Sequence, residues 1–386
     1  MKKLIKKLKY LTALLIGFFI VIIFKFISFF RKIRFGIIYT GRVGHLCHNV
    51  DAYLSQRKKN EISIFGIQKK ISNEFILNGW KKNNNIYFSK IGFYGFFFLK
   101  TFFPKNRMLI KWSELYPNYS IDILKKKNFN TKDLQKQKKK LNIEYKINKS
   151  PYICFHNRDD AYLKLKGGDG NEHSFRNFNI NDYRSSINLV TSKNLKAIRL
   201  GRITNQNITK INNKNYMEFT NKNSNDFTDT FLINNCEFLI ASATGLSNIA
   251  SILRKKIILV NTIPFWLREM YQYTKGSIFL PKKIYSIKKK RMLKFCEIEA
   301  LEYNIHEKNF FKKRKLRIIN NTQDEIFFSV KEMMENYKIN NYKKYESKLH
   351  DKFWNSITDQ RAVNIVRNKL CLNISDSFLK KNKSLI

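Results

Sequence analysis

Apolar runs and helix-like stretches alternate along the chain from residue 35 onward. In the first half, the pattern predicts strands at 35–40, 62–67 and 108–112, a helix through Leu46, Val50, Tyr53 and Leu54, and a short helix or turn at 73–79. Strands that alternate with helices are typical of a parallel sheet covered on both faces. The first half is therefore expected to form an α/β domain.

A second α/β series begins at Pro151. The pattern predicts strands at 152–156, 195–200, 216–219, 238–241, 257–260 and 277–280, and helices at 181–193, 227–234 and 247–253. Thr322 and Glu325 have the spacing of a capping box, which predicts a helix that begins there and continues through Met334. We expect a second parallel sheet in this half.

The stretch between Lys125 and Lys149 is rich in Lys, Asn and Gln and has few apolar positions, apart from a possible short helix around Leu134 and Leu141. Such a change in composition is typical of a domain boundary. The expected division is a membrane segment at 1–34, a Rossmann-like domain at 35–149, a second one at 150–345 and a C-terminal helical tail at 346–386.

The N-terminal segment is apolar from Tyr10 to Phe30, interrupted only by Lys25 and Ser28, with basic residues on both sides. Its length suffices to span a bilayer, which takes about 20 residues, and no small-residue cleavage site follows it. An in-plane helix would keep both basic flanks with anionic headgroups. We expect membrane association at the cytoplasmic face of the inner (cell) membrane, with spanning and in-plane arrangements both open. The aromatic stretch 93–103 is either buried or a second membrane-facing patch.

The formal net charge of +45, from 74 Lys+Arg against 29 Asp+Glu, first suggests a nucleic-acid binder. The lysines are spread rather than gathered into one stripe, so nucleic acid is not expected and an anionic membrane surface is favoured. The five cysteines lie far apart without metal-ligand spacing, which indicates reduced core residues. His45 and His48 are three residues apart but lack a third ligand nearby, so no metal site is expected.

Candidate chemistry gathers at the ends of the predicted strands, where open α/β sheets bind their ligands. The loop Gly41 to His45 combines glycines, which let a backbone approach a ligand, with a histidine that could act as a general base. The loop Ser242 to Gly245 lies between a strand and a helix N-terminus, which suits a phosphate. A glycine turn with an incidental histidine and a tight turn of small residues remain open for these two loops.

Three more polar stretches follow strands or lie between them. Arg158 comes directly after a buried-type strand and can grip a diphosphate, with Asp159 or Asp160 holding its guanidinium or reaching a sugar hydroxyl. The loop that contains His173, Ser174 and Arg176 is long and glycine-rich, and the turn after the next strand carries Arg202. The chain lacks an intact dinucleotide fingerprint, a Walker loop and a G-x-S-x-G elbow, which disfavours nicotinamide enzymes, P-loop ATPases and serine hydrolases.

These segments resemble a family of bacterial glycosyltransferases associated with surface-polysaccharide gene sets, and more distantly the GT-B class. The resemblance runs from about Phe35 to Tyr337 and is carried by GRVGHLCHNVDAYL, HNRDDAYL, HSFRNFNINDYRSSI, RLGR, DFTDTFLINNCEFLIASATGLSNIA and ILVNTIPF. It implies two Rossmann-like domains, with the acceptor on the N-terminal one and the donor on the C-terminal one.

Carried over by position, the resemblance implies that the donor is faced by Arg158, His173, Arg176, Arg202, Thr244 and Gly245, and that the acceptor side is lined by Gly41, Arg42, Gly44 and His45. The polar neighbours Asp160, Ser174 and Ser242 complete the expected donor site. The cleft expected between the two domains would hold the donor on one wall and the catalytic base, His45, on the other.

The sequence therefore predicts a metal-independent glycosyltransferase that moves a sugar from a nucleotide-diphosphate sugar to a lipid-linked or polysaccharide acceptor, with no cofactor besides the donor. Two alternatives stay open at this point. One is a nucleotide-sugar epimerase of the same fold, and the other is a non-catalytic basic protein that binds membranes or nucleic acid.

Overall fold

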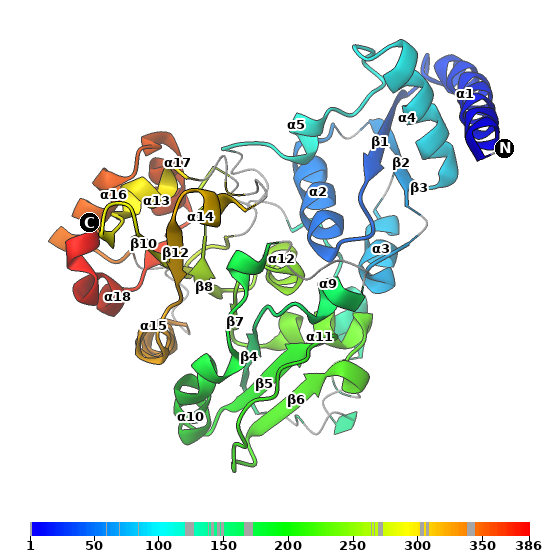
Figure 1. Ribbon diagram of the computed structural model, residues 1–386. Helices are drawn as coiled ribbons and strands as arrows, with labels where there is room; N and C mark the ends of the chain where they lie inside the picture. The colour runs from blue at the N-terminus through cyan, green and yellow to red at the C-terminus, as the bar shows by residue number, and fades with distance from the viewer. Residues whose placement is uncertain are drawn as a thin grey trace. The chain divides into compact units, whose positions relative to one another are not determined.

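The computed structural model describes residues 2–386, except for positions 59, 69, 84, 120–126, 138, 140–142, 145–146, 148–149, 166–172, 264, 266, 269–272, 302–304, 306–308 and 338–343. The chain forms two compact units, shown in Figure 1. Unit 1 comprises Met1–Asn118 and Lys125–Asn130, and unit 2 comprises Tyr119–Leu124 and Thr131–Ile386. Each unit contains a parallel sheet with helices, which confirms the predicted α/β class.

The elements of unit 1 follow the predicted alternation of strands and helices. They are α1 (Lys2–Ile27), β1 (Lys32–Ile38), α2 (Val43–Gln56), β2 (Glu61–Ile67), α3 (Glu74–Lys81), β3 (Ile86–Phe88), α4 (Lys90–Phe102) and α5 (Trp112–Leu115). The three strands are parallel in the order β1-β2-β3. The predicted strand at 108–112 is reduced to one bridge between Leu109 and Phe35, because the chain turns into α5 at Trp112.

The two faces of the unit 1 sheet are covered by different helices. On one face, α2 packs its Tyr53 ring edge-on against Phe65, with ring centroids 5.2 Å apart. On the other face lie α4 and α1, and Figure 1 shows these two helices side by side. Gly92 of α4 lies so close to β2 that a Cβ there would be 2.5 Å from the backbone nitrogen of Gly66, so only glycine fits. The stretch 93–103 is therefore a covering helix, with some of its aromatic rings exposed.

The elements of unit 2 include a longer α/β series and a C-terminal helical part. Its strands are β4 (Tyr152–His156), β5 (Lys196–Gly201), β6 (Tyr216–Thr220), β7 (Leu239–Ala241), β8 (Ile257–Thr262), β9 (Ile278–Pro281), β10 (Lys283–Ser286), β11 (Arg291–Met292), β12 (Leu316–Ile319) and β13 (Asn373–Ile374). Its α-helices are α7 (Lys132–Lys136), α9 (Ala161–Leu165), α10 (Arg184–Ser192), α11 (Asp226–Asn235), α12 (Gly245–Ile252), α13 (Phe295–Glu299), α14 (Phe310–Lys313), α15 (Gln323–Asn336), α16 (Lys348–Ser356), α17 (Gln360–Asn364) and α18 (Asp376–Lys381).

Seven strands of unit 2 form one parallel sheet in the order β13-β9-β8-β7-β4-β5-β6. From β4, the chain first builds outward through β5 and β6, and then returns to add β7, β8 and β9 on the other side of β4. This is the doubly wound order, and its direction of growth reverses between β4 and β7. Strand β8 is buried throughout and β5 is buried except at Lys196, because helices lie against the sheet.

Two local predictions in unit 2 are confirmed and two regions were not anticipated. The capping box is present, since the Thr322 side chain accepts from the backbone of Glu325 at the start of α15. The antiparallel sheet β11-β10-β12 was not predicted. The segment from 346 onward, expected as a helical tail, contains β13, which pairs with β9 of the main sheet. The helix expected around Leu134 is α7, whereas Leu141 lies outside the described residues.

Candidate functional site

The loops that follow β4 and β7 flank the point where the order of the unit 2 strands reverses. In open α/β sheets, ligands bind outside the carboxyl ends of the strands at such a switch point. Arg158 lies two residues after β4, and Ser242 to Thr244 connect β7 to α12. The structure thus places two of the predicted donor loops at the position that sheet topology favours for a ligand.

The loop between β7 and α12 is fixed by a capping box. The Ser247 hydroxyl accepts from the backbone N–H of Thr244 at 2.9 Å, while the Thr244 hydroxyl caps the backbone of Ser247. Gly245 is the first residue of α12, whose N-terminus carries the positive end of the helix dipole. Ser242 is fully buried, and its hydroxyl has no hydrogen-bond partner among the described residues.

The predicted loop at 173–177 meets the β7–α12 loop through Arg176. The Nη1 atom of Arg176 donates to the backbone oxygen of Ala243 at 3.3 Å. Ser174 and Arg176 belong to one turn of 3-10 helix, and His173 before it has a left-handed backbone with φ of 61°. The structure therefore brings a guanidinium to the loop that holds Ser242 and Thr244. The glycines of this loop, Gly167, Gly168 and Gly170, lie outside the described residues.

Lys282 is a buried amine at the same sheet edge that the sequence did not single out. It follows β9, is 1% exposed, and its Nζ donates to the backbone oxygen of Asn177 at 3.0 Å. Burial lowers the pKa of Lys282 to about 7, although the Asp182 carboxylate opposes this shift. Lys282 therefore holds the segment next to Arg176. No sequence pattern marks it, because most lysines of this basic chain look alike.

The carboxylates after β4 organise the neighbouring loop after β5. Asp159 accepts from the Thr204 hydroxyl at 2.6 Å and from the backbone N–H of Asn205 at 3.1 Å. Asp160 forms an ion pair with Lys164 at 2.5 Å, and this contact is the main reason why its pKa is lowered. These bonds give both carboxylates a structural role in the described residues.

Arg202 is held away from the strands that flank the switch point. It follows β5 and forms an ion pair with Asp226 in the first turn of α11, which begins after β6. Since β6 is the edge strand on the far side of β5, this pair lies on the opposite side of β4 from β7. The structure brings Arg176 to the β7–α12 loop and places the guanidinium of Arg202 at α11.

In unit 1, the loop after β1 presents His45 in the first turn of α2. The Nδ1 atom of His45 shares a hydrogen bond with the hydroxyl of Tyr116. Burial lowers the pKa of His45, and the positive charge of Arg42 lowers it further. The imidazole is therefore neutral at neutral pH, which is the form that accepts a proton from a substrate hydroxyl. Gly41 and Gly44 shape the same loop, and the backbone N–H of Gly41 donates to the side chain of Gln68 at 3.2 Å.

Aromatic rings surround His45, and the sequence did not identify them as a group. Tyr39 and Trp112 are 43% and 55% exposed, and their ring centroids are 5.9 Å apart. Trp112 also lies 4.3 Å from the ring centroid of Tyr116. Exposed rings next to a polar group can hold the apolar face of a ligand while the polar group binds its hydroxyls. The sequence did not reveal this cluster, because the pattern at 108–112 predicted a strand and Trp112 instead begins α5.

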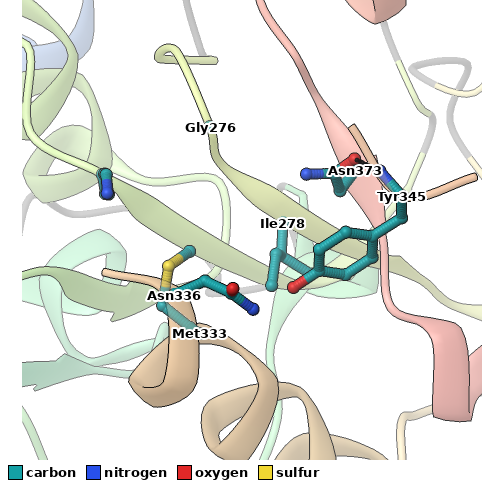
Figure 2. A pocket seen from close by; sticks show the side chains of 7 residues that line it. Gly276, Ile278, Met333, Asn336, Tyr345 and Asn373 are labelled. Carbon is teal, nitrogen blue, oxygen red and sulfur yellow. Dashed lines mark hydrogen bonds between the residues drawn. The ribbon is translucent and has the colours of Figure 1, made fainter. Parts of the chain in front are cut away.

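A small cavity of unit 2 lies at the opposite end of the sheet. Figure 2 shows its lining, which includes Gly276, Ile278, Met333, Asn336, Tyr345 and Asn373. Ile278 opens β9, so the cavity lies at the amino ends of the strands and away from the switch point. Within the described residues, no group of three His, Cys, Asp or Glu side chains is arranged to hold a metal ion.

No family model and no curated protein sequence matches the chain. Among solved structures, it is similar to a glycosyl transferase family 9 protein from Veillonella parvula, with 11% identity, a TM-score of 0.44, and coverage of 65% of this chain and 86% of that one. It is also similar to E. coli ADP-heptose lps heptosyltransferase II, with 10% identity, a TM-score of 0.43 and coverage of 64% and 90%. A third similar structure is E. coli heptosyltransferase WaaC with ADP, with 11% identity, a TM-score of 0.37, and coverage of 64% of this chain and 93% of that one. Likenesses of this size leave the activity to be inferred from the residues of this chain.

Proposed function

We propose that this protein is a glycosyltransferase that moves a sugar from a nucleotide-diphosphate sugar to a lipid-linked or cell-surface polysaccharide acceptor at the cytoplasmic face of the cell membrane. One observation carries the proposal. At the switch point of the unit 2 sheet, the Arg176 guanidinium donates to the backbone of Ala243, in the loop that leads from Ser242 into the capped N-terminus of α12. Cationic and hydrogen-bond donor groups at that position are suited to a diphosphate.

In the proposed transfer, the bond between the anomeric carbon and the diphosphate oxygen breaks, and its electron pair leaves on the diphosphate. Arg158, Arg176 and the N-terminus of α12 offset the charge that develops there, as preorganised donors do in other transfer reactions. A new bond forms between the anomeric carbon and the acceptor oxygen. His45, neutral because its pKa is lowered, takes the acceptor proton. No metal and no cofactor besides the donor enters this scheme.

The proposal is tested first by ligand binding. A panel of nucleoside diphosphates and nucleotide sugars is added to the full chain, and the melting temperature is measured, because a ligand that binds the folded state raises the apparent stability. We expect one base type to raise it. Absence of a shift with every member of the panel would contradict a transferase. Conversion of a sugar nucleotide to its epimer without any acceptor would instead identify the epimerase alternative.

Turnover of the identified donor is then compared in Arg158→Ala and in Arg291→Ala. Arg158→Ala should lower kcat/KM about 10²–10³-fold, the range for losing one charge-stabilising donor. Arg291 lies on β11 and pairs with Glu297, so its loss should leave kcat/KM near the wild-type value. Both variants should keep the wild-type circular dichroism spectrum, and treatment with EDTA should leave turnover intact. A fully active Arg158→Ala protein would refute the donor-site assignment.

A further inference from the structure

One stripe of α1 is packed against the rest of unit 1. Gly17 and Val21 are buried, and Gly17 lies so close to α4 that a Cβ there would be 2.5 Å from the backbone oxygen of Tyr94. Further along α1, Phe24 makes an edge-on ring contact with Phe35 of β1, with centroids 5.5 Å apart. This stripe therefore serves as part of the cover of the unit 1 sheet, together with α4.

The opposite face of α1 is exposed and apolar. Phe19, Ile23 and Phe26 are 56%, 57% and 68% exposed, and Phe30 in the turn after the helix is 90% exposed. These positions recur at helical spacing on the side away from the packed stripe. A contiguous exposed apolar surface of this kind marks a binding surface.

The exposed surface continues from α1 onto the end of α4. The ring of Phe18 on α1 lies 5.7 Å from that of Phe98 on α4, and Phe98 in turn lies within 6.0 Å of the rings of Phe102 and Phe103. Phe102 and Phe103 are each 53% exposed. We call this region the α1–α4 surface. It consists of the exposed side chains of α1, α4 and the residues just after them: Phe19, Ile23, Phe26, Phe30, Phe102 and Phe103.

The charges next to this surface fit an anionic lipid headgroup layer. No Asp or Glu occurs before Asp51 or between Phe75 and Ser113, so both helices and their flanks carry only positive charge. Lys6, Lys7 and Lys9 precede the apolar part of α1, and Lys100 and Lys105 flank the exposed end of α4. Basic residues beside an inserted apolar face are typical of a helix that lies in the membrane interface.

A spanning arrangement of α1 conflicts with its packing. The helix is apolar and long enough to cross a bilayer, with 24 residues from Leu4 to Ile27. One side of the segment that would have to cross, including Tyr10, Val21 and Phe24, makes ring and core contacts with α4 and β1. If α1 crossed the bilayer with these contacts in place, the charged strand β1, with its Arg34–Glu114 ion pair, would be drawn toward the hydrocarbon.

We propose that α1 and α4 together form a membrane-docking surface that lies in one leaflet of an anionic bilayer, with both ends of α1 on the same side as unit 1. In this arrangement α4 is a second anchor, and unit 1 is attached to the membrane through two helices instead of a flexible tether. The proposal concerns lipid binding alone, so its test needs no substrate and its failure would leave the glycosyltransferase proposal standing.

The immersion of α4 is measured by fluorescence quenching. The full-length Phe103→Trp protein is mixed with phosphatidylcholine vesicles that contain phosphatidylglycerol, with and without brominated acyl chains. We expect added quenching over the wild-type protein, and a larger bound fraction with phosphatidylglycerol than without it. The matched control is Phe328→Trp, on the 45% exposed position of α15 in unit 2, which should add no quenching. If Phe103→Trp were quenched no more than the wild-type protein, α4 would not enter the membrane. The same result would be seen if a second copy of the chain covered this surface, and it would overturn the proposal in either case.

The in-plane orientation of α1 is measured by labelling. Lys6→Cys and Phe328→Cys proteins are expressed, and inverted membrane vesicles are treated with a membrane-impermeant maleimide, with the wild-type protein as background. We expect Lys6→Cys to be labelled without detergent, as Phe328→Cys is. Labelling of Lys6→Cys only after detergent is added would show that α1 crosses the membrane and would overturn the in-plane arrangement.

Discussion

The two loops that lead from a strand into a helix at the candidate sites are built differently. The loop after β1 enters α2 through Arg42, which makes no side-chain cap, and it presents the half-buried imidazole of His45. The loop after β7 enters α12 through Thr244, which forms a capping box, and it presents only small hydroxyl side chains and a glycine. One loop therefore offers a titratable group, and the other offers fixed donors.

Under the proposed function, this difference corresponds to a division of roles between the units. A rigid loop without titratable side chains is suited to holding an anion, because its hydrogen-bond donors need no rearrangement when negative charge develops on the ligand. A neutral histidine beside a tyrosine hydroxyl is suited to accepting a proton, because its lowered pKa keeps it unprotonated at neutral pH. Under the proposed function, binding belongs to unit 2 and proton transfer to unit 1.

The largest effect that would break this comparison is expected at His45. His45→Gln should lower kcat/KM by about 10²–10⁴-fold, the range for losing a general base. Since the pKa of His45 is lowered from its usual 6.5, the wild-type kcat/KM should fall only as the pH drops below that value. The pH profile of the variant should lack this acidic limb.

Tyr116→Phe serves as the companion variant, because it removes the hydroxyl that contacts His45 and leaves the imidazole in place. It should keep the acidic limb and shift its position. An acidic limb that persists unchanged in His45→Gln would assign the proton transfer to another group and would remove the contrast between the two loops.

Much of the fold was predictable because its signals are local. The strand Tyr152–His156 is a short apolar run, and the helix after Thr322 carries its own capping box, so each is specified by neighbouring residues. The run at 108–112 has the same local pattern as a strand, yet only Leu109 finds a partner, in Phe35. Pairing depends on the neighbouring strand, which a local pattern does not contain.

The candidate site was predictable only in part, for the same reason. The loops at strand ends could be placed, because parallel strands bring their carboxyl ends to one edge. The burial of Lys282 depends on the carbonyl of Asn177, which is distant along the chain, and the partner of Arg202 depends on where α11 begins. The exposure of the aromatic rings of α4 likewise depends on α1, which covers the remainder of that face.

A second, smaller effect sharpens the comparison. It concerns whether the titration of Lys282 in unit 2 changes the free energy of unfolding. The pKa of Lys282 is lowered to about 7 in the folded protein, from about 10.4 in an unfolded chain. Between these values the unfolded state binds more protons, so the free energy of unfolding should rise with pH, by up to about 1.4 kcal/mol per pH unit. Below about pH 7 both states are protonated and the slope disappears.

Lys282→Met should remove this slope, whereas Lys288→Met, at an exposed position in the β10–β11 turn, should keep it. Denaturant titrations at several pH values between 7 and 10 measure both. A slope that is the same in Lys282→Met and in the wild type would mean that Lys282 is solvated. The segment next to Arg176 would then lack the buried amine that bonds Asn177.

The smallest expected effect compares the two helix starts directly. Thr244→Ala removes the side chain that caps α12 and should lower the free energy of unfolding by about 1 kcal/mol, the typical value of an N-cap. Arg42→Ala removes an N-cap residue that makes no side-chain cap bond, so it should leave the stability within about 0.5 kcal/mol of the wild type. Denaturant unfolding of the two variants measures the difference. Equal losses would show that the β7–α12 loop is no more firmly fixed than the β1–α2 loop, and the assignment of binding to the first and proton transfer to the second would lose its structural basis.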